Sequence, residues 1–308
     1  MNRDKLKQHV NTWITRLGSQ SKTAARIGIS DASLSLWLKD KYGADTDKLD
    51  KTIAVALDYR ESSWVVVPTI RNYMVVQAVF ESCKTESLWM AISNKAGSGK
   101  TQTLKDLFNN DSTGTVIYIQ AEEWTSRQFL TMVMKATCGA PKGYMNVSRM
   151  LDEISDYFKR LSSNSPILII DEADKLKPAA LRTLIPLYNR TEHQLGCILS
   201  GTENLEKEIK RGVRNAMKGY DEIDSRLGRT YIKLNGVTKP EAISICKANG
   251  IETEEACEVI WNECEKENKL VKLKNAKGEI REKPVMHCED LRRLMRLIKR
   301  ELLTQRLA

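Results

Sequence analysis

One eight-residue string, residues 94–101, constrains the fold of this 308-residue chain more than any other feature. The string reads NKAGSGKT and matches the phosphate-binding pattern G-x-x-x-x-G-K-S/T, except that Asn94 stands where the first glycine belongs. It follows an apolar, strand-like run at 88–93 and opens a helical pattern at Thr101. Strand, glycine-rich loop and helix in this order indicate a nucleotide phosphate site, because backbone N–H groups converge at the N-terminus of such a helix.

Each position of this phosphate loop has an expected task. Gly97 and Gly99 let the backbone approach the phosphates, Lys100 reaches the β and γ phosphates of ATP, and the Thr101 hydroxyl is offered to Mg²⁺. Asn94 is expected to adopt a left-handed backbone conformation, because asparagine enters that region more readily than other residues with a Cβ. The candidate nucleotide-binding residues of the loop are Asn94, Lys95, Ala96, Gly97, Ser98, Gly99, Lys100 and Thr101.

A second motif, ILIIDEAD at residues 167–174, is an apolar strand that ends in carboxylates. This arrangement places Asp171 at the carboxyl edge of a sheet, where open α/β folds bind their ligands. We expect Asp171 to hold Mg²⁺ and Glu172 to act as general base on the attacking water, a role that hydrolysis requires. A lone Asp after a strand is often only a helix cap, so the pairing with the phosphate loop favours catalysis.

Five short apolar runs separated by helical patterns predict an α/β fold with a parallel sheet covered on both faces. The runs span 88–93, 115–119, 166–170, 196–200 and 230–234. Strands are expected to stop after about residue 238, where helical patterns predict a lid that a loop or hairpin segment interrupts at 274–279. The predicted parts are a helix-turn-helix-like domain (1–60), a linker with one helix (61–87), an ATPase core (88–236) and a helical C-terminal domain (237–308).

The N-terminal part contains two short helical patterns, 21–27 and 31–39, joined by a turn at Gly28. This helix-turn-helix pattern indicates DNA binding with the second helix in a major groove, where Ser33 and Lys39 are left on the outside. Small protein-binding modules use the same pattern, so both interpretations stay open. No arginine lies on the exposed face of the second helix, which argues against strong sequence-specific readout.

Composition excludes some classes and leaves others open. The chain is 41% hydrophobic and 29% charged, and no apolar run approaches the roughly 20 residues that cross a bilayer. The N-terminus lacks a signal-peptide pattern, so we expect a cytoplasmic protein. Seven scattered cysteines and three distant histidines predict reduced, mostly buried thiols and argue against zinc. A net charge of +9 is compatible with a polyanionic partner but does not identify one.

The order of these motifs, with GCILSGTEN at 196–204 after the acidic strand, resembles the AAA+ superfamily. Together with the N-terminal segment ISDASLSLWLKDKYG, the chain resembles the phage Mu transposition protein B family of target-DNA-binding ATPases. The resemblance covers nearly the whole chain. Its ATPase motifs are specific to the superfamily, whereas the Mu B assignment rests on domain order and the N-terminal match.

The resemblance implies further roles at matching positions. Thr202, with Asn204 as second choice, matches the polar sensor of the γ phosphate. Arg226 matches the arginine finger that reaches a neighbouring subunit's γ phosphate, and Arg229 remains an alternative. Arg292 matches a nucleotide-contacting position of the lid.

The resemblance also implies partners, namely duplex DNA, further copies of the chain in a helical filament, and a transposase. The family lines its filament interior with basic residues, and spacing does not choose among those that the sequence offers. The candidates in the core are Lys105, Arg127, Lys142, Arg149, Lys159 and Arg160. The implied function is ATP-dependent, largely sequence-nonspecific DNA binding that delivers target DNA for transposition, a form of DNA recombination.

Three other functions remain open at the level of sequence. A helicase loader or an insertion-sequence accessory ATPase would share the same core. A transcriptional regulator would read an operator with its helix-turn-helix and use nucleotide only to control oligomerisation. A signalling ATPase would have no DNA role.

Overall fold

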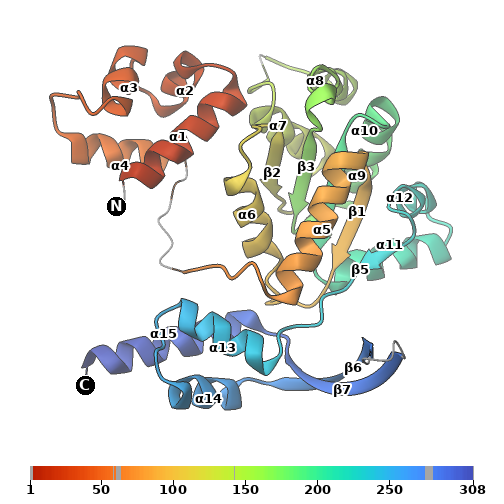
Figure 1. Ribbon diagram of the computed structural model, residues 1–308. Coiled ribbons are helices and arrows are strands. Elements are labelled where there is room, and N and C mark those ends of the chain that lie inside the picture. Colours follow the sequence, from red (N-terminus) through yellow and green to blue (C-terminus); the bar gives the residue numbers. More distant parts are fainter. Residues whose placement is uncertain (1–2, 58, 60–63, 142, 275–279, 308) are drawn as a thin grey trace. The chain divides into compact units, whose positions relative to one another are not determined.

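The computed structural model describes residues 3–57, 59, 64–141, 143–274 and 280–307 (Figure 1). The chain divides into two compact units. The first comprises Met1–Ser63 and Leu107–Val116, and the second comprises Trp64–Asp106 and Ile117–Ala308. The predicted linker residues 61–63 lie outside the described part of the chain.

The N-terminal helices form a small bundle with its own core. They are α1 (Arg3–Leu17), α2 (Gln20–Ile27), α3 (Asp31–Leu38) and α4 (Thr46–Ala56). Gly28 ends α2 in the left-handed conformation, with φ of 84°, and the Ser30 side chain caps α3 by accepting from the Ser33 amide. Leu34 and Trp37 are buried on the inner face of α3. The helix-turn-helix arrangement is therefore present within one residue of its predicted bounds.

The second unit is built on a five-stranded parallel sheet with the order β2-β3-β4-β1-β5. Its strands are β1 (Trp89–Ser93), β2 (Val116–Gln120), β3 (Ile167–Asp171), β4 (Gly196–Gly201) and β5 (Tyr231–Ile232). Every residue of β3 and β4 is buried, which explains why these strands are continuous apolar runs rather than alternating ones. The predicted α/β class and all five predicted strands are confirmed, although β5 is shorter than expected.

Helices flank this sheet, as Figure 1 shows. They are α5 (Arg71–Glu86), α6 (Lys100–Asn110), α7 (Ser126–Ala136), α8 (Val147–Arg160), α9 (Pro178–Arg182), α10 (Leu184–Thr191), α11 (Glu203–Arg214) and α12 (Tyr220–Arg226), with short 3₁₀ turns at Ser162–Asn164 and Ala173–Lys175. Their amphipathic patterns bury one face each. In α8, for example, Met150, Leu151, Ile154 and Phe158 are buried.

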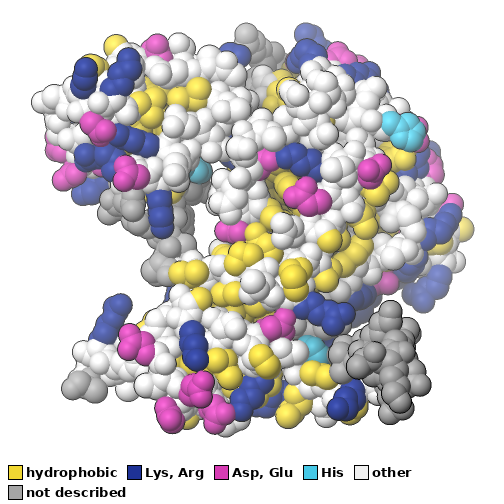
Figure 2. All heavy atoms as spheres, viewed as in Figure 1, with side chains coloured by type: hydrophobic (Ala, Val, Ile, Leu, Met, Phe, Trp, Pro, Cys, Tyr) yellow, Lys and Arg dark blue, Asp and Glu magenta, His cyan; other side chains and the backbone are white. Residues whose placement is uncertain are grey.

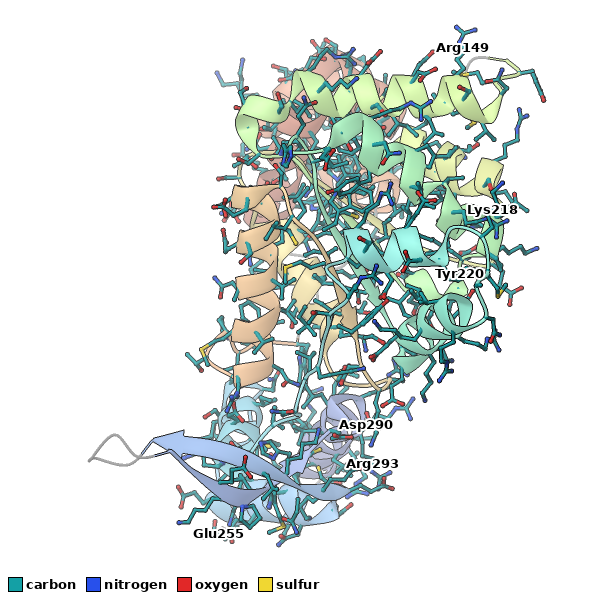
Figure 3. All side chains as sticks on the ribbon, turned by 90° about the vertical axis from the view of Figure 1, so that its right-hand side faces the viewer. Arg149, Lys218, Tyr220, Glu255, Asp290 and Arg293 are labelled. Carbon is teal, nitrogen blue, oxygen red and sulfur yellow. The ribbon has the colours of Figure 1, made fainter. Side chains whose placement is uncertain are left out.

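The C-terminal part corrects one expectation. It contains α13 (Lys239–Ala248), α14 (Glu254–Glu263) and α15 (Leu291–Leu307), but also an antiparallel pair, β6 (Lys266–Lys274) and β7 (Ile280–Cys288). The prediction that strands end near residue 238 is wrong. The two strands are stabilised by pairing along nine residues each, and this pairing cannot be recognised from their charged sequences. Figure 3 shows the hairpin extending beyond the three helices. Lys274, the first residue of the predicted loop at 274–279, is the last residue of β6, and residues 275–279 lie outside the described part of the chain.

The distribution of charged residues and cysteines can be compared with what the composition predicts. Lys and Arg side chains are interspersed with Asp and Glu on the face seen in Figure 2, so the net charge of +9 is not one continuous basic field there. Six of the seven cysteines are buried thiols, as predicted, and Cys138 is exposed. Among the described helices, none is long and apolar enough to cross a membrane.

Candidate nucleotide-binding site

The sheet order brings three predicted motifs to one edge. Because β4 lies between β1 and β3 and all three are parallel, the residues that follow them converge at the carboxyl end of the sheet. A cavity of about 320 Å³ lies there. Its lining includes Lys100 and Thr101 after β1, Asp171 and Glu172 at the end of β3, and Thr202 after β4.

The phosphate loop has the backbone that its glycines predict. Gly97 and Gly99 have φ of 83° and 91°, in the left-handed region that favours glycine. A Cβ on Gly97 would overlap the Asp290 carboxylate, so glycine is needed there for space as well. The loop leads into α6 at Lys100, which leaves the amides of its first turn available to an anion.

Lys100 is buried, with an exposed fraction of 8%. Its ammonium donates to the carbonyls of Asn94 (2.8 Å) and Lys95 (3.0 Å) and to the Ser98 hydroxyl (3.1 Å). Burial lowers the pKa of Lys100, and the nearby Asp171 opposes that shift. A buried ammonium with neutral acceptors gains more from a phosphate than an exposed one does, because the phosphate supplies the missing opposite charge.

Asn94 keeps the loop in place by a different means from the predicted one. It is not among the residues with positive φ, so the expectation of a left-handed backbone is wrong. Instead, the Asn94 side chain is buried and its Oδ1 accepts from the Leu234 amide at 3.3 Å, while its backbone N–H donates to Gly201 at 3.3 Å. The side-chain amide thus links the loop to the segment after β5, a contact that glycine lacks.

Asp171 is almost fully buried, at 1% exposed, and both carboxylate oxygens have donors. The Tyr118 hydroxyl of β2 donates to Oδ2 at 2.8 Å, and the Ser200 hydroxyl of β4 donates to Oδ1 at 2.8 Å. These two donors orient the carboxylate at the sheet edge. Sequence reasoning missed both, although Ser200 in the fully buried strand β4 signals a polar group that needs a partner.

Glu172 has φ of 56°, a left-handed conformation that costs a non-glycine residue about 1–3 kcal/mol and occurs preferentially at functional sites. Its carboxylate pairs with the Lys175 ammonium three residues later, and this contact raises the pKa of Lys175. Both side chains line the cavity. The candidate base is therefore at the cavity and has a cationic neighbour.

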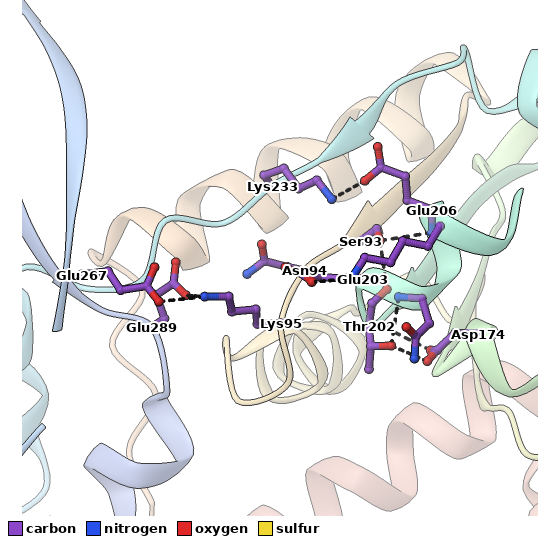
Figure 4. Close-up of polar contacts among 12 residues, drawn as sticks. Ser93, Asn94, Lys95, Asp174, Thr202, Glu203, Glu206, Lys233, Glu267 and Glu289 are labelled. Carbon is purple, nitrogen blue, oxygen red and sulfur yellow. Dashed lines mark hydrogen bonds and ion pairs between the residues drawn. The ribbon is translucent and has the colours of Figure 1, made fainter. Parts of the chain in front are cut away.

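Thr202 is tied to the acidic motif, as Figure 4 shows. Its hydroxyl donates to Asp174 Oδ2 at 2.6 Å and its backbone N–H donates to Oδ1 at 3.1 Å. The same hydroxyl accepts from the Asn204 amide at 3.3 Å and caps α11. Asn204, the second choice for a sensor, is exposed on the first turn of that helix and is absent from the cavity lining.

The C-terminal part closes the cavity from the other side. The Leu291 amide donates to the Gly97 carbonyl at 2.9 Å, and Arg292 lines the cavity on the first turn of α15. Lys95 of the loop pairs with Glu267 (2.8 Å) and Glu289 (2.7 Å), as Figure 4 shows. Lys95 therefore contacts carboxylates here, a role that the loop pattern did not predict.

The apolar wall of the cavity was also missed by sequence reasoning. It comes from the segment before α5, which the sequence predicts to be a linker, and from the C-terminal helices. The apolar lining residues are Trp64, Val65, Val66, Val67, Ile70, Ile245, Leu291, Leu294 and Met295. Asn249 fixes this segment, because its side chain accepts from the Val65 amide at 2.8 Å and donates to the Val65 carbonyl at 3.1 Å.

The two candidate fingers lie apart from this cavity, since neither lines it. Arg226 at the end of α12 donates to Asn189 at 2.7 Å and stacks over the Tyr188 ring at 5.2 Å. Arg229 pairs with the exposed Asp221 at 2.8 Å and the buried Asp224 at 3.4 Å. The chain thus brings together the phosphate loop, the carboxylates, Thr202 and Arg292, but not Arg226 or Arg229.

The candidate DNA contacts of the core mostly have intramolecular partners. The contacts are Lys105 with Gln120 (3.3 Å), Arg127 with the Tyr144 ring (4.2 Å), Arg149 with Glu153 (3.5 Å) and Lys159 with Asp156 (3.9 Å). Arg160 is exposed, as is Lys39 on the N-terminal bundle, while the Ser33 hydroxyl bonds with Ser30 at 2.8 Å. Lys142 lies outside the described residues. Their roles stay predictions.

The oxygens at the sheet edge fit a nucleotide-bound Mg²⁺. This ion is usually held by one or two protein oxygens, with phosphates and waters completing its octahedron. The Thr101 hydroxyl and the Asp171 carboxylate both line the cavity, and they are the groups that would hold it.

A protein-family model matches the part of the chain that carries this geometry. Residues 86–209 match a family model described as an AAA domain, a range that includes the phosphate loop, the two carboxylates and Thr202. Among solved structures, the Cdc6p protein from Pyrobaculum aerophilum matches with 16% sequence identity and a TM-score of 0.48. That alignment covers 65% of this chain and 56% of Cdc6p. No curated protein matches the sequence.

The sheet order, the phosphate loop at its carboxyl edge and the matched domain define an AAA+ P-loop fold. They support a nucleotide-hydrolysing ATPase.

Proposed function

We propose that this protein is an ATP-dependent DNA-binding ATPase that assembles on duplex DNA with little sequence preference and presents that DNA to a transposase. The observation that carries the ATPase part is the cavity that gathers Lys100, Asp171, Glu172, Thr202 and Arg292. The DNA part is supported by the helix-turn-helix bundle and by the motif order shared with the Mu B family.

In this proposal the side chains divide the work of hydrolysis. Lys100 and the amides of the phosphate loop bind the β and γ phosphates, with Lys100 exchanging its backbone acceptors for phosphate oxygens. Glu172 accepts a proton from the attacking water after its carboxylate leaves Lys175. Mg²⁺, held by Thr101 and Asp171, neutralises charge on the phosphates when it is bound. Arg292 on α15 contacts the nucleotide from the C-terminal side.

Assembly follows from the position of the finger. Lys100 and Arg292 line the cavity but neither Arg226 nor Arg229 does, so an additional cationic group for the γ phosphate, the arginine finger, would come from a neighbouring subunit. We propose Arg226 for this role, and Arg229 is its alternative. ATP binding then favours a polymer, and hydrolysis favours its release from DNA.

Electron microscopy of negatively stained protein tests this function. Wild-type protein with ATP should form polymers on long duplex DNA, and Lys100→Ala protein should form none under the same conditions. Absence of any ATP-dependent polymer on DNA would remove the filament proposal.

Competition binding separates the proposal from an operator-binding regulator. Random duplex DNA should compete with any preferred sequence to within about tenfold, and binding should require ATP. Discrimination far beyond tenfold, with binding that persists without ATP, would contradict the transposition role.

A further inference from the structure

The C-terminal end of α11 carries an exposed row of cations that none of the assigned roles uses. Lys207, Arg211, Arg214 and Lys218 recur at spacings of four, three and four residues, which places the three helical ones on one face and continues their line past the helix end. Lys207 pairs with Glu203 at 3.0 Å. Arg211, Arg214 and Lys218 are exposed, and among the described residues none of them has a carboxylate within ion-pair distance. We call these three residues the α11 cations.

The neighbouring basic residue shows the contrast. Lys210 points the other way and donates to the buried Asp224 at 3.0 Å, so its charge is neutralised inside the chain. Two of the α11 cations, Arg211 and Arg214, lie in the last turn, where cations interact favourably with the helix dipole. That explanation does not extend to Lys218, which follows the end of the helix.

The turn that bears these cations is firmly built. Gly212 packs against the Tyr220 ring, where a Cβ would overlap the ring, and Tyr220 is 2% exposed. The Tyr220 hydroxyl donates to Glu208 at 3.0 Å, and the Met217 amide donates to the Gly212 carbonyl at 2.9 Å. Figure 3 labels Lys218 and Tyr220 at this turn, and Figure 2 shows Lys and Arg side chains gathered at the edge where Figure 1 places α11. The cations are therefore held on a rigid support.

The same helix reaches the nucleotide cavity. Thr202, which lines the cavity, caps the N-terminus of α11, and the cations lie at the opposite end, about 18 Å away for twelve residues at 1.5 Å each. The turn then leads into α12, which ends at Arg226. One helical hairpin thus joins the γ-phosphate sensor position, the α11 cations and the candidate finger.

We propose that Arg211, Arg214 and Lys218 contact the phosphate backbone of duplex DNA and link DNA binding to ATP turnover. The partner is a polyanion because the row is cationic and, in the described part of the chain, is not ion-paired. We expect this DNA binding to be independent of sequence, because such cations contact phosphates rather than base edges. This inference rests on the proposed DNA-binding function and names its surface.

The test compares two variants with equal charge. The first is Arg211→Ala/Arg214→Ala/Lys218→Ala. The control is Arg296→Ala/Lys299→Ala/Arg306→Ala on α15, which also removes three exposed cations. Binding of a fluorescent random-sequence duplex is measured by anisotropy with ATP at several salt concentrations. The α11 variant should bind about a hundredfold or more weakly in 0.1 M salt, and its slope of log affinity against log salt should fall by about three.

Turnover gives the second readout. ATP hydrolysis without DNA should be unchanged in the α11 variant, and its stimulation by DNA should be lost, whereas the control should keep both affinity and stimulation. Wild-type DNA affinity in the α11 variant, or an equal loss of DNA affinity in the control, would overturn this inference but not the proposed function. If wild-type protein with ATP binds no duplex, the proposed function fails and this inference fails with it.

Discussion

The charged residues of the nucleotide cavity and those at the end of α12 have different kinds of partners. In the cavity, the described hydrogen-bond partners of the Lys100 ammonium are all neutral acceptors, and Asp171 is oriented by two hydroxyls. At α12, Arg226 is held by Asn189 and Glu222, and Arg229 by two aspartates. The cavity therefore holds buried charges whose opposite charges a nucleotide and its metal ion would supply, whereas Arg226 and Arg229 already have partners within their own chain.

This difference indicates how the site works. A chain alone can bind nucleotide, because the binding groups already converge. In the proposed mechanism, the chain's own cavity lacks the arginine finger, and an arginine from another subunit leaves its intramolecular partners to stabilise the transition state. On this proposal, hydrolysis depends on assembly, while nucleotide binding does not.

The largest effect is expected from Lys100→Ala, which removes the buried ammonium from the cavity. Nucleotide binding and turnover should both fall below detection, because the phosphates lose their main positive partner. Binding of a fluorescent ATP analogue and release of phosphate measure the two losses. Lys135→Ala, an exposed position on α7, should leave both unchanged, and normal binding by Lys100→Ala would contradict the assignment of the cavity.

Arg226 at the end of α12 and Arg229 just beyond it should affect turnover without affecting nucleotide binding. Loss of an arginine finger slows phosphoryl transfer by about 10³-fold or more, so Arg226→Ala should do so in the DNA-bound state. Arg229→Ala should change the rate only a few-fold, because that side chain stabilises Asp221 and Asp224 locally. Steady-state hydrolysis with saturating duplex DNA distinguishes them, and the reverse result would assign the finger to Arg229.

Glu172→Gln removes the base but keeps the shape of the cavity. Turnover should fall by about 10²–10⁴-fold, as expected when a general base is lost, while ATP and DNA binding persist. Single-turnover hydrolysis and DNA anisotropy measure these quantities. A variant that hydrolyses ATP at the wild-type rate would show that Glu172 is not the base.

Tyr118→Phe should have the smallest effect, because it removes one of the two hydroxyls that orient Asp171. Loss of a hydrogen bond to a buried carboxylate is expected to cost about 1–3 kcal/mol of unfolding free energy. We also expect a few-fold lower turnover at limiting Mg²⁺ that high Mg²⁺ partly restores. Denaturant unfolding and Mg²⁺ titrations measure the two effects. The control is Tyr188→Phe, which removes a hydroxyl that donates to the exposed Glu192 carboxylate. It should change neither the unfolding free energy nor the Mg²⁺ dependence.

The sequence predicts the core of this molecule well because its signals are local. A glycine-rich loop between strand and helix, and an apolar strand that ends in Asp171, can be recognised without knowledge of the fold. The contacts that it did not predict are long-range. Tyr118 lies 53 positions from Asp171, and Asn94 reaches Leu234 across 140 positions, so neither spacing is a motif.

The C-terminal hairpin shows a second limit. Its strands are rich in lysine, a residue more typical of a solvated helix or loop, and the strand structure becomes evident only from their pairing. The ion pairs of Lys95 with Glu267 and Glu289 depend on that pairing. The segment Trp64 to Val67, which forms part of the apolar wall, likewise has the sequence pattern of a linker. Its role in the cavity could not be predicted, because Asn249, which holds it in place, lies far away in the sequence.

Mixing two inactive variants tests the central claim, that one chain's cavity needs another chain's arginine. Glu172→Gln has an intact finger, and Arg226→Ala has an intact cavity. Phosphate release is measured for each alone and for mixtures at constant total protein on duplex DNA. A cavity from Arg226→Ala next to the finger of Glu172→Gln should be active, so mixtures should recover turnover with a maximum at intermediate ratios. Mixtures no more active than the separate variants at every ratio would contradict a finger that acts between subunits.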